Sequence, residues 1–440
     1  MPNRPQPPLL KRKVNKMAAE QKESVFKYFV RQITSLPRTP GNIATLVIFA
    51  FGALITIMRF TLGIDSVSNL DDNNPWGIWI GFDLMCGVAL AAGGYTCSSA
   101  CYLLGFKRYH SAVRPAITTA FLGYLFVVIA LLYDVGQPWR LPYPLTVSFG
   151  TTSILFEVGL CVGIYLSVLF IEWSPVAMEW MMSIRQTEGE KAVHPKVYKA
   201  LVWVRPYLRR IRKIVLWMTI PLTVMGVILS TMHQSSLGSL FLIVPSKLHP
   251  LWYSAFLPVF FFVSSMAAGL SMVIFEGTLA HKALHSKMDE THLAEADGVV
   301  LGLGRACAII LAGYFMMKIM DIGMDHDWHW LFTGYGAWFA VELIGFVAVP
   351  CMLYAMGARE RKTCYMRWAA ALTVAGIVMN RFNVSMVAFN WQLPSVDRYF
   401  PSFLEVMLSV FIVTCIVTAY RFIAAKMPML YELKEFKSHH

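Results

Sequence analysis

Residues 73–87 read NNPWGIWIGFDLMCG, and they open a run that stays almost wholly apolar as far as Leu104. An α-helix needs only about 20 apolar residues to cross the hydrocarbon core of a bilayer. The run contains one carboxylate, Asp83, and a charge at that depth costs free energy unless it faces water or a protein interior. The stretch therefore predicts a membrane-spanning helix whose acid points into a bundle of other helices.

The composition of the whole chain is typical of a polytopic membrane protein. Of the 440 residues, 57% are hydrophobic and 15% are charged, whereas soluble domains carry roughly 25% charged residues. The mean hydropathy is +0.54. We therefore predict an all-α transmembrane domain over residues 42–424, between tails at 1–41 and 425–440. Ten segments are long enough to span a bilayer, near residues 42–63, 76–104, 115–134, 149–172, 212–232, 251–277, 298–320, 332–356, 364–382 and 400–424.

Lysine and arginine are distributed unevenly over the connecting segments. Of the 38 Lys and Arg residues, 31 lie in the two tails and in alternate loops, whereas the opposite loops hold five. This asymmetry is typical of the positive-inside rule, and it predicts a protein of the cytoplasmic (inner) membrane with both termini in the cytoplasm. It also argues against nucleic acid as the reason for the net charge of +12.

Two basic segments have the pattern of helices that lie along lipid head groups. Residues 19–36 show helical spacing of Val25, Phe26, Phe29 and Ile33, with a disordered basic tail as the alternative. The second segment is residues 192–213. The first 40 residues have no apolar core followed by a cleavage site, so we expect no cleavable signal peptide.

Cysteine and histidine usage argues against a metal centre or a self-contained haem. The eight cysteines show no CxxC pattern, and the only histidine within a predicted span is His233. A transmembrane b-type haem held by two imidazoles needs two histidines at matched depth. A haem with a methionine ligand, or one shared with a partner, stays open. We predict no haem and no metal in this chain.

Several ionisable side chains lie inside the predicted spans. No residue next to Asp83, Glu157 or Glu342 in the sequence offsets the cost of burying their charge, so we expect functional roles for these three. The others lie nearer the ends of the spans. They are Asp134, His233, Lys318, Asp321, Arg381 and Glu405 towards the outside, and Glu172, Glu276 and Arg305 towards the cytoplasm.

For most of the others a structural role stays open. Lys318 and Asp321 are one helical turn apart and can neutralise each other. Asp134 can pair with Arg140 in the loop YDVGQPWRLP, and the two acids towards the cytoplasm can simply be solvated. His233 lies in STMHQSSLGSL. An imidazole there can donate a hydrogen bond and a proton to a carbonyl oxygen, and the alternative is a capping residue held by a neighbouring loop.

Eight motifs occur in the order of a known family. With them, residues 42–424 resemble the NrfD/PsrC family of polysulfide reductase membrane subunits, and within it the HybB-type membrane subunits of uptake NiFe-hydrogenases. The motifs are NPWGIWIGFD, YDVGQPW, SILFE, TMHQSSLGSL, HPLWYS, MVIFEG, SMVAFN and YFPSFLE.

The resemblance implies a haem-free anchor of two four-helix bundles, spans two to five and six to nine, with flanking helices. It implies that menaquinone or ubiquinone binds near the outer face. Electrons would come from a periplasmic ferredoxin-like iron–sulfur subunit and its catalytic subunits, such as a NiFe-hydrogenase. The quinone residues would be Trp76, Gly77, Asp83, Asp134 and His233, to which we add Gln234 and Ser235.

Proton transfer would involve a second set of residues. His233 and Asp83 would handle the protons of quinone reduction. Glu157 and Glu276 match acidic positions of the family that resemble a proton route, and we place Glu172 and Glu342 on it as well. The chain would thus be the quinone-reactive subunit of an anaerobic respiratory complex, without activity of its own.

Two alternatives stay open. The same role could serve a sulfur-metabolism or multihaem-cytochrome complex, because nothing in these residues names the electron donor. A proton-coupled secondary transporter is the alternative from another class, because ten helices with acids near the midplane also suit transporters.

Overall fold

The structure is a computed structural model that describes residues 39–184, 195–285, 288–431 and 433. The segment 19–36 and parts of both tails lie outside these residues. Within the described part, nine helices are long and apolar enough to cross a membrane, or ten if one bent pair counts as a single span. They match the ten predicted spans one for one, so the all-α fold with about ten spans is confirmed.

Most spans are single helices, and several run past their predicted ends. Hydropathy marks only the apolar part of a helix, whereas backbone hydrogen bonding continues into polar residues. The longer helices also take in His110 and His281, so the prediction that His233 is the only histidine in a span is wrong. The helices are α3 (Pro40–Leu62), α4 (Met85–Ala91), α5 (Gly93–Tyr102), α6 (His110–Asp134), α7 (Tyr143–Thr146), α8 (Ile154–Ser183), α9 (Pro195–Trp217), α10 (Thr219–Ser239), α11 (Leu257–Leu284), α12 (Glu290–Met324), α13 (Gly334–Ala340), α14 (Val349–Glu360), α15 (Thr363–Phe382) and α16 (Phe403–Lys426).

Three spans contain a π-helical segment. The second span opens with one at Trp79–Leu84, before α4 and α5. The others are Val341–Ala348, between α13 and α14, and Asn383–Val387, after α15. π-Helical turns interrupt the regular bonding of an α-helix and are frequent at functional sites. Here they carry Asp83, Glu342 and Asn383.

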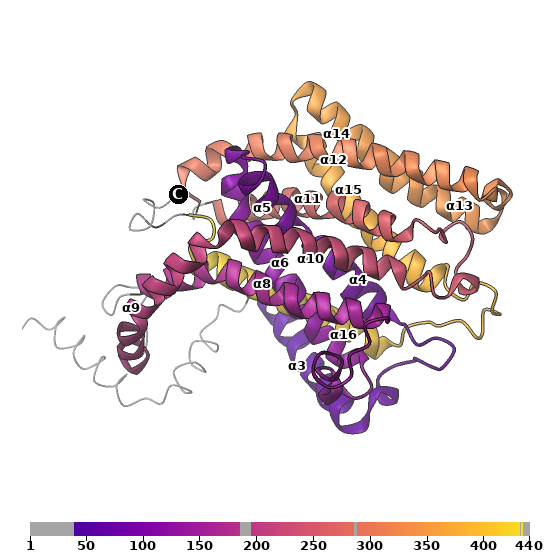
Figure 1. Cartoon of the computed structure of the whole chain (residues 1–440), viewed down its shortest axis with the longest axis horizontal. Coiled ribbons are helices and arrows are strands. Elements are labelled where there is room, and N and C mark those ends of the chain that lie inside the picture. Colours follow the sequence, from indigo (N-terminus) through magenta and orange to yellow (C-terminus); the bar gives the residue numbers. More distant parts are fainter. Residues whose placement is uncertain (1–38, 185–194, 286–287, 432, 434–440) are drawn as a thin grey trace, which may run out of the picture.

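The spans pack as two groups with a flanking pair (Figure 1). One bundle contains α4–α5, α6, α8 and α10, and the other contains α11, α12, α13–α14 and α15. Helix α3 pairs with α16, which also packs on α6. The bundles meet where α5 crosses α11, and a Cβ on Gly93 would lie 2.7 Å from the carbonyl oxygen of Gly269. Small residues allow transmembrane helices to approach this closely.

Helix α9 turns away from the first bundle at an angle of 62° to α10. Its surface carries exposed aromatic rings, with Trp203 72% and Trp217 82% exposed. Its inner side is held by a buried carboxylate on α8. Glu179 accepts a hydrogen bond from Arg212 Nε at 3.0 Å and forms an ion pair with Arg114 Nη1 at 3.0 Å. This placement agrees with a helix that lies along the membrane surface.

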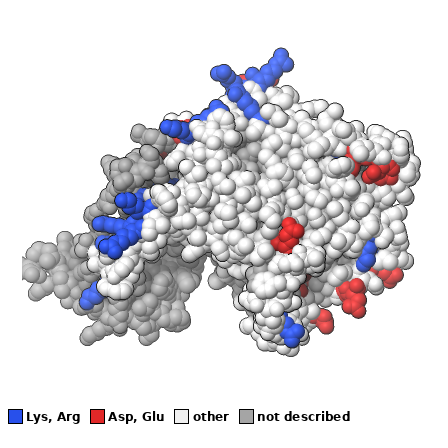
Figure 2. Space-filling model, viewed as in Figure 1, with Lys and Arg blue, Asp and Glu red and all other residues white. Residues whose placement is uncertain are grey.

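The two ends of the bundle differ in charge. Figure 2 shows Lys and Arg gathered over the left and upper parts of this face, and Asp and Glu towards the right. We call the end with the 103–109 and 361–362 connections the basic end, and the opposite end the acidic end. Exposed acids of the acidic end are Asp65, Asp71, Asp72, Asp325 and Asp397.

Candidate functional site

The core of the first bundle contains a buried histidine with one free nitrogen. His233 of α10 is fully buried, and its Nδ1 lies 3.1 Å from the Tyr124 hydroxyl of α6. Its Nε2 has no hydrogen-bond partner. The next residue, Gln234, donates from Nε2 to the carbonyl oxygen of Val88 at 3.0 Å, while its Oε1 also lacks a partner. Two consecutive residues of α10 therefore each have a buried polar atom without a partner, His233 Nε2 and Gln234 Oε1.

Tyrosines surround this histidine, and the sequence analysis missed them. The rings of Tyr124 and Tyr165 meet edge to face with centroids 4.6 Å apart, and both residues are fully buried. The Ser230 hydroxyl of α10 interacts with the hydroxyls of both tyrosines. A tyrosine in the middle of an apolar span is a signal that could have been used, because its hydroxyl needs a partner when buried.

Asp83 of the second span and Asp134 of α6 both lie towards the flanking helices α3 and α16. Asp83 is buried, and its Oδ2 accepts a hydrogen bond from Ser409 of α16 at 2.7 Å. Asp134 ends α6, and its Oδ1 has no partner. The cation that acts on it is Arg59 of α3, rather than Arg140. Arg59 itself is buried and donates to the carbonyl oxygens of Tyr133 and Val135 at 2.7 and 2.8 Å.

Trp76 and Gly77 lie at the acidic end. The Trp76 ring packs against Phe241 and Phe389, with centroid distances of 5.7 and 5.6 Å. Gly77 is required sterically, because a Cβ would lie 2.5 Å from the Tyr399 hydroxyl. Ser235 is partly buried. The residues predicted as one quinone site thus belong to separate groups. His233 and Gln234 lie in the bundle core, Asp83 and Asp134 lie beside α3 and α16, and Trp76 and Gly77 lie at the acidic end.

Glu342 is held by three N–H groups. Trp252 Nε1 and Asn383 Nδ2 donate to its Oε2 at 2.9 and 2.5 Å, and Asn380 Nδ2 donates to Oε1 at 2.6 Å. The Asn380 Oδ1 accepts from Arg381 Nη1 at 2.7 Å, so the amide bridges the acid and a buried cation. The Glu342 carboxylate is therefore fixed in place by donors from three residues, in a network that also contains a buried cation.

The remaining acids differ in their surroundings. Glu157 is partly exposed in the first turn of α8 and accepts from Ser236 Oγ at 2.6 Å. Glu405 closes a capping box with Ser402 at the start of α16, which is a structural role. Asp321 accepts from Ser254 Oγ at 2.5 Å, while Lys318 Nζ lies 4.1 Å from the centre of the Phe260 ring.

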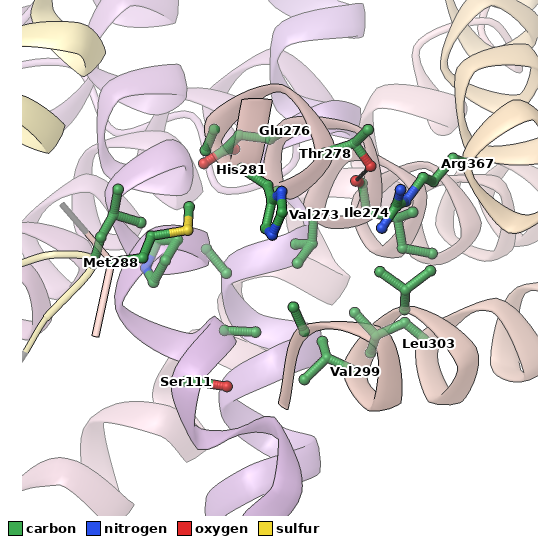
Figure 3. Close-up of a pocket in the computed structure, with 18 of the residues that line it drawn as sticks. Ser111, Val273, Ile274, Glu276, Thr278, His281, Met288, Val299, Leu303 and Arg367 are labelled. Carbon is green, nitrogen blue, oxygen red and sulfur yellow. Dashed lines mark hydrogen bonds between the residues drawn. The ribbon is translucent and has the colours of Figure 1, made fainter. Parts of the chain in front are cut away.

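Glu172 and Glu276 line two pockets at the basic end. The Glu172 pocket, about 580 Å³, is also lined by His110 and Arg114. The Glu276 pocket, about 740 Å³, lies between α6, α11 and α12 (Figure 3). Glu276 accepts a hydrogen bond at Oε2 from the Thr119 hydroxyl, and its Oε1 has no partner. Both acids can therefore meet water from the basic end.

A second buried histidine lies in the loop before α11, outside the spans. His249 is fully buried, and its Nδ1 accepts from the Leu251 N–H at 3.2 Å. Rings of Trp330, Tyr335 and Trp391 surround it at centroid distances of 5.1, 4.6 and 4.8 Å. Burial lowers the pKa of His249 to about 4. Its imidazole is therefore neutral at physiological pH and packs as an aromatic ring.

We expect His249 to make the folded state less stable as the pH falls from about 6.5 towards 4. An unfolded histidine binds a proton near pH 6.5, whereas folded His249 does so only near pH 4. Between pH 6.5 and pH 4 the unfolded state binds more protons than the folded state. The free energy of unfolding therefore decreases as the pH falls through this range. Thermal unfolding of the purified protein in detergent measures the effect. His249→Phe should show a weaker pH dependence, and an unchanged dependence would assign it to other groups.

No group of three or more His, Cys, Asp or Glu side chains in the described part of the chain could hold a metal ion.

Comparison with known proteins identifies the family. Residues 66–390 match the family model described as Polysulphide reductase, NrfD. The chain is 64% identical over 402 residues to a protein of Nitratidesulfovibrio vulgaris, an alignment that covers 91% of this chain and 97% of the relative. It is 30% identical over 408 residues to the probable Ni/Fe-hydrogenase 2 b-type cytochrome subunit of Escherichia coli, with 90% and 95% covered. It is 27% identical over 386 residues to the menaquinone reductase, integral membrane subunit, of Nitratidesulfovibrio vulgaris, with 83% and 86% covered. The chain is therefore a multi-pass integral membrane protein of the NrfD family.

Proposed function

We propose that this chain is the haem-free, quinone-reactive membrane subunit of a respiratory oxidoreductase. The observation that carries the proposal is His233, a fully buried imidazole that is held at Nδ1 by Tyr124 and whose Nε2 has no partner. A buried polar atom without a partner costs free energy. A quinone carbonyl oxygen at Nε2 would remove that cost.

The imidazole is suited to protonate a quinone. When the Tyr124 hydroxyl donates to Nδ1, the neutral ring carries its proton on Nε2. Reduction of a quinone to a quinol takes up two electrons and two protons, one at each oxygen. His233 Nε2–H passes its proton to one oxygen as charge develops there, while Nδ1 takes up the proton of the Tyr124 hydroxyl, so the ring stays neutral. The proton route then returns a proton to Tyr124 and supplies the proton for the other oxygen. Gln234 Nε2 donates to the carbonyl oxygen of Val88 and so holds α10 against α4. We therefore assign it no hydrogen bond to the quinone.

The electrons come from a partner at the acidic end, which faces the periplasm if the basic end lies in the cytoplasm. We propose a ferredoxin-like iron–sulfur subunit with catalytic subunits of the hydrogenase type. Support comes from the likeness to the Escherichia coli hydrogenase subunit, and the likeness to a menaquinone reductase subunit supports menaquinone as the substrate. A sulfur-metabolism or multihaem-cytochrome donor would use the same quinone chemistry.

Protons are drawn from the cytoplasmic side through Glu276 and Glu172, which line pockets at the basic end. Glu157 and Asp83 then serve as inner groups, each with a hydroxyl partner, Ser236 and Ser409 respectively. Glu342 is left off this route because three N–H donors occupy both of its carboxylate oxygens.

Purification of the tagged chain with its native partners tests the proposal. We expect co-purification of an iron–sulfur subunit, an absorption spectrum without a haem Soret band from this chain, and reduction of a short-chain menaquinone analogue by hydrogen or by a low-potential dye. Solute uptake by liposomes that contain the chain alone, together with no quinone reduction by the complex, would contradict it and favour a transporter.

A further inference from the structure

The Glu276 pocket lies at the basic end and is lined by one buried acid. Its walls are largely apolar, with Val299 and Leu303 of α12 facing α11. Figure 3 shows Glu276 and His281 on the same helix, with the His281 ring pointing into the space above Val299 and Leu303. The two are the titratable groups that α11 contributes to this pocket.

Exposure to solvent falls in steps along α11. His285, in the cap position after the helix, is exposed, His281 is partly buried, and Glu276 is only 9% exposed. The rings of His281 and His285 lie 5.0 Å apart between centroids. His281 is five residues from Glu276, or roughly 7.5 Å along the axis at about 1.5 Å per residue. That gap is too long for a direct hydrogen bond and suits a bridge of one or two waters.

Glu276 has one oxygen available for such a bridge. Its Oε2 is taken by the Thr119 hydroxyl, while its Oε1 is buried without a partner and the residue lines the pocket. A buried acceptor of this kind is usually satisfied by ordered water. Besides this carboxylate and the imidazole, the polar side chains that line the pocket are Ser111, Thr278, Arg367 and Tyr420. Water chains between Glu276 and His281 can therefore also bind to these groups.

We propose that His281 is the group that takes protons from the cytoplasm into this pocket and passes them to Glu276. The inference rests on the proposed function, in which Glu276 lies on the proton route. One ring nitrogen of His281 binds a proton from bulk water or from His285, and the other nitrogen releases its own proton to pocket water. That water protonates Glu276 Oε1. One proton moves inward in each cycle, and no electrons are exchanged.

The charges that face His281 allow this role. Arg367 of α15 lines the same pocket, and its charge is offset by an ion pair to Asp297 of α12 at 3.2 Å. Tyr420 of α16 also lines it, and its hydroxyl interacts with the Glu276 carboxylate. On α11 itself the neighbours are Lys282, exposed on the next position, and His285. Glu276 is thus the carboxylate among the pocket-lining residues, and it is the natural acceptor of the proton.

The test uses the whole complex reconstituted in liposomes. A pH indicator is placed on the side of the membrane that the basic end of this chain faces. Quinone reduction is started with the electron donor, and the rate of proton uptake is compared in wild type, His281→Gln, Lys282→Gln and Glu276→Gln. We expect His281→Gln to slow uptake at least about tenfold at alkaline pH, as for loss of a positioned proton-transfer group. Added imidazole, a diffusible proton carrier, should restore most of the rate.

Lys282→Gln is the matched control, because it removes a surface cation from the same turn without touching the pocket. Imidazole rescue separates proton transfer from a folding defect, since a misfolded pocket would not respond to a buffer. If proton uptake is normal in His281→Gln but impaired in Glu276→Gln, the role of His281 is overturned while the proton route through Glu276 stands. A phospholipid chain found in the pocket would explain that result. Normal uptake in Glu276→Gln as well would overturn the proton route itself.

Discussion

Replacing His233 with alanine is expected to lower quinone reduction by at least about 100-fold, the usual effect of losing a positioned general acid. Tyr124 holds Nδ1 of this buried imidazole, and Nε2 has no partner and can bind the quinone. Without it, a bound quinone loses its hydrogen-bond donor and its proton source together. The measurement is steady-state reduction of a menaquinone analogue by the purified complex.

Two further variants separate the roles of the ring. His233→Gln keeps an N–H donor near the position of Nε2 but cannot protonate, so it should keep substrate binding and lose turnover. Tyr124→Phe keeps the ring packing and removes the group that holds Nδ1, so we expect a smaller loss. Assembly of the complex must be checked for each. Normal turnover in His233→Ala would remove this histidine from the quinone site.

Replacing Glu342 with leucine is expected to destabilise the protein by roughly 3 kcal/mol or more, because each buried donor that loses its acceptor costs about 1–3 kcal/mol. The change leaves the N–H groups of Trp252, Asn380 and Asn383 without their acceptor. It also leaves Arg381, which is 1% exposed, without the negative charge to which Asn380 links it. Thermal or denaturant unfolding in detergent measures the loss.

Glu360→Leu, on α14 of the same span, is the matched control. Its carboxylate pairs with Lys362 at 2.8 Å, but both side chains are well exposed, and such surface pairs contribute little. The double variant Glu342→Leu with Arg381→Met should recover part of the loss, because it removes the charge that the single change strands. A double variant as unstable as the sum of the two single ones would show that acid and cation are not coupled.

Much of the fold was predictable because a bilayer imposes a local rule. Every span must be apolar over about 20 residues, so the ten spans and their alternation could be read from neighbouring residues alone. The true ends of the helices, and with them the inclusion of His110 and His281, could not be predicted. Hydropathy does not report where backbone hydrogen bonding ends. Of the site, His233 was predictable as a rare ionisable group in an apolar span, but Tyr124 and Tyr165 were hidden among ordinary core aromatics.

From its sequence alone, this protein is determined to be a ten-span helical membrane protein with a basic and an acidic end, carrying acids and an imidazole among apolar residues. Only the tertiary structure decided which atoms surround each of these groups. It placed Asp83 against Ser409, far along the chain, and away from His233, and it gave Glu342 three donors while it left Glu276 one free oxygen. The physical reason is that the cost of burying a charge is set by the atoms around it, and those atoms come from other helices.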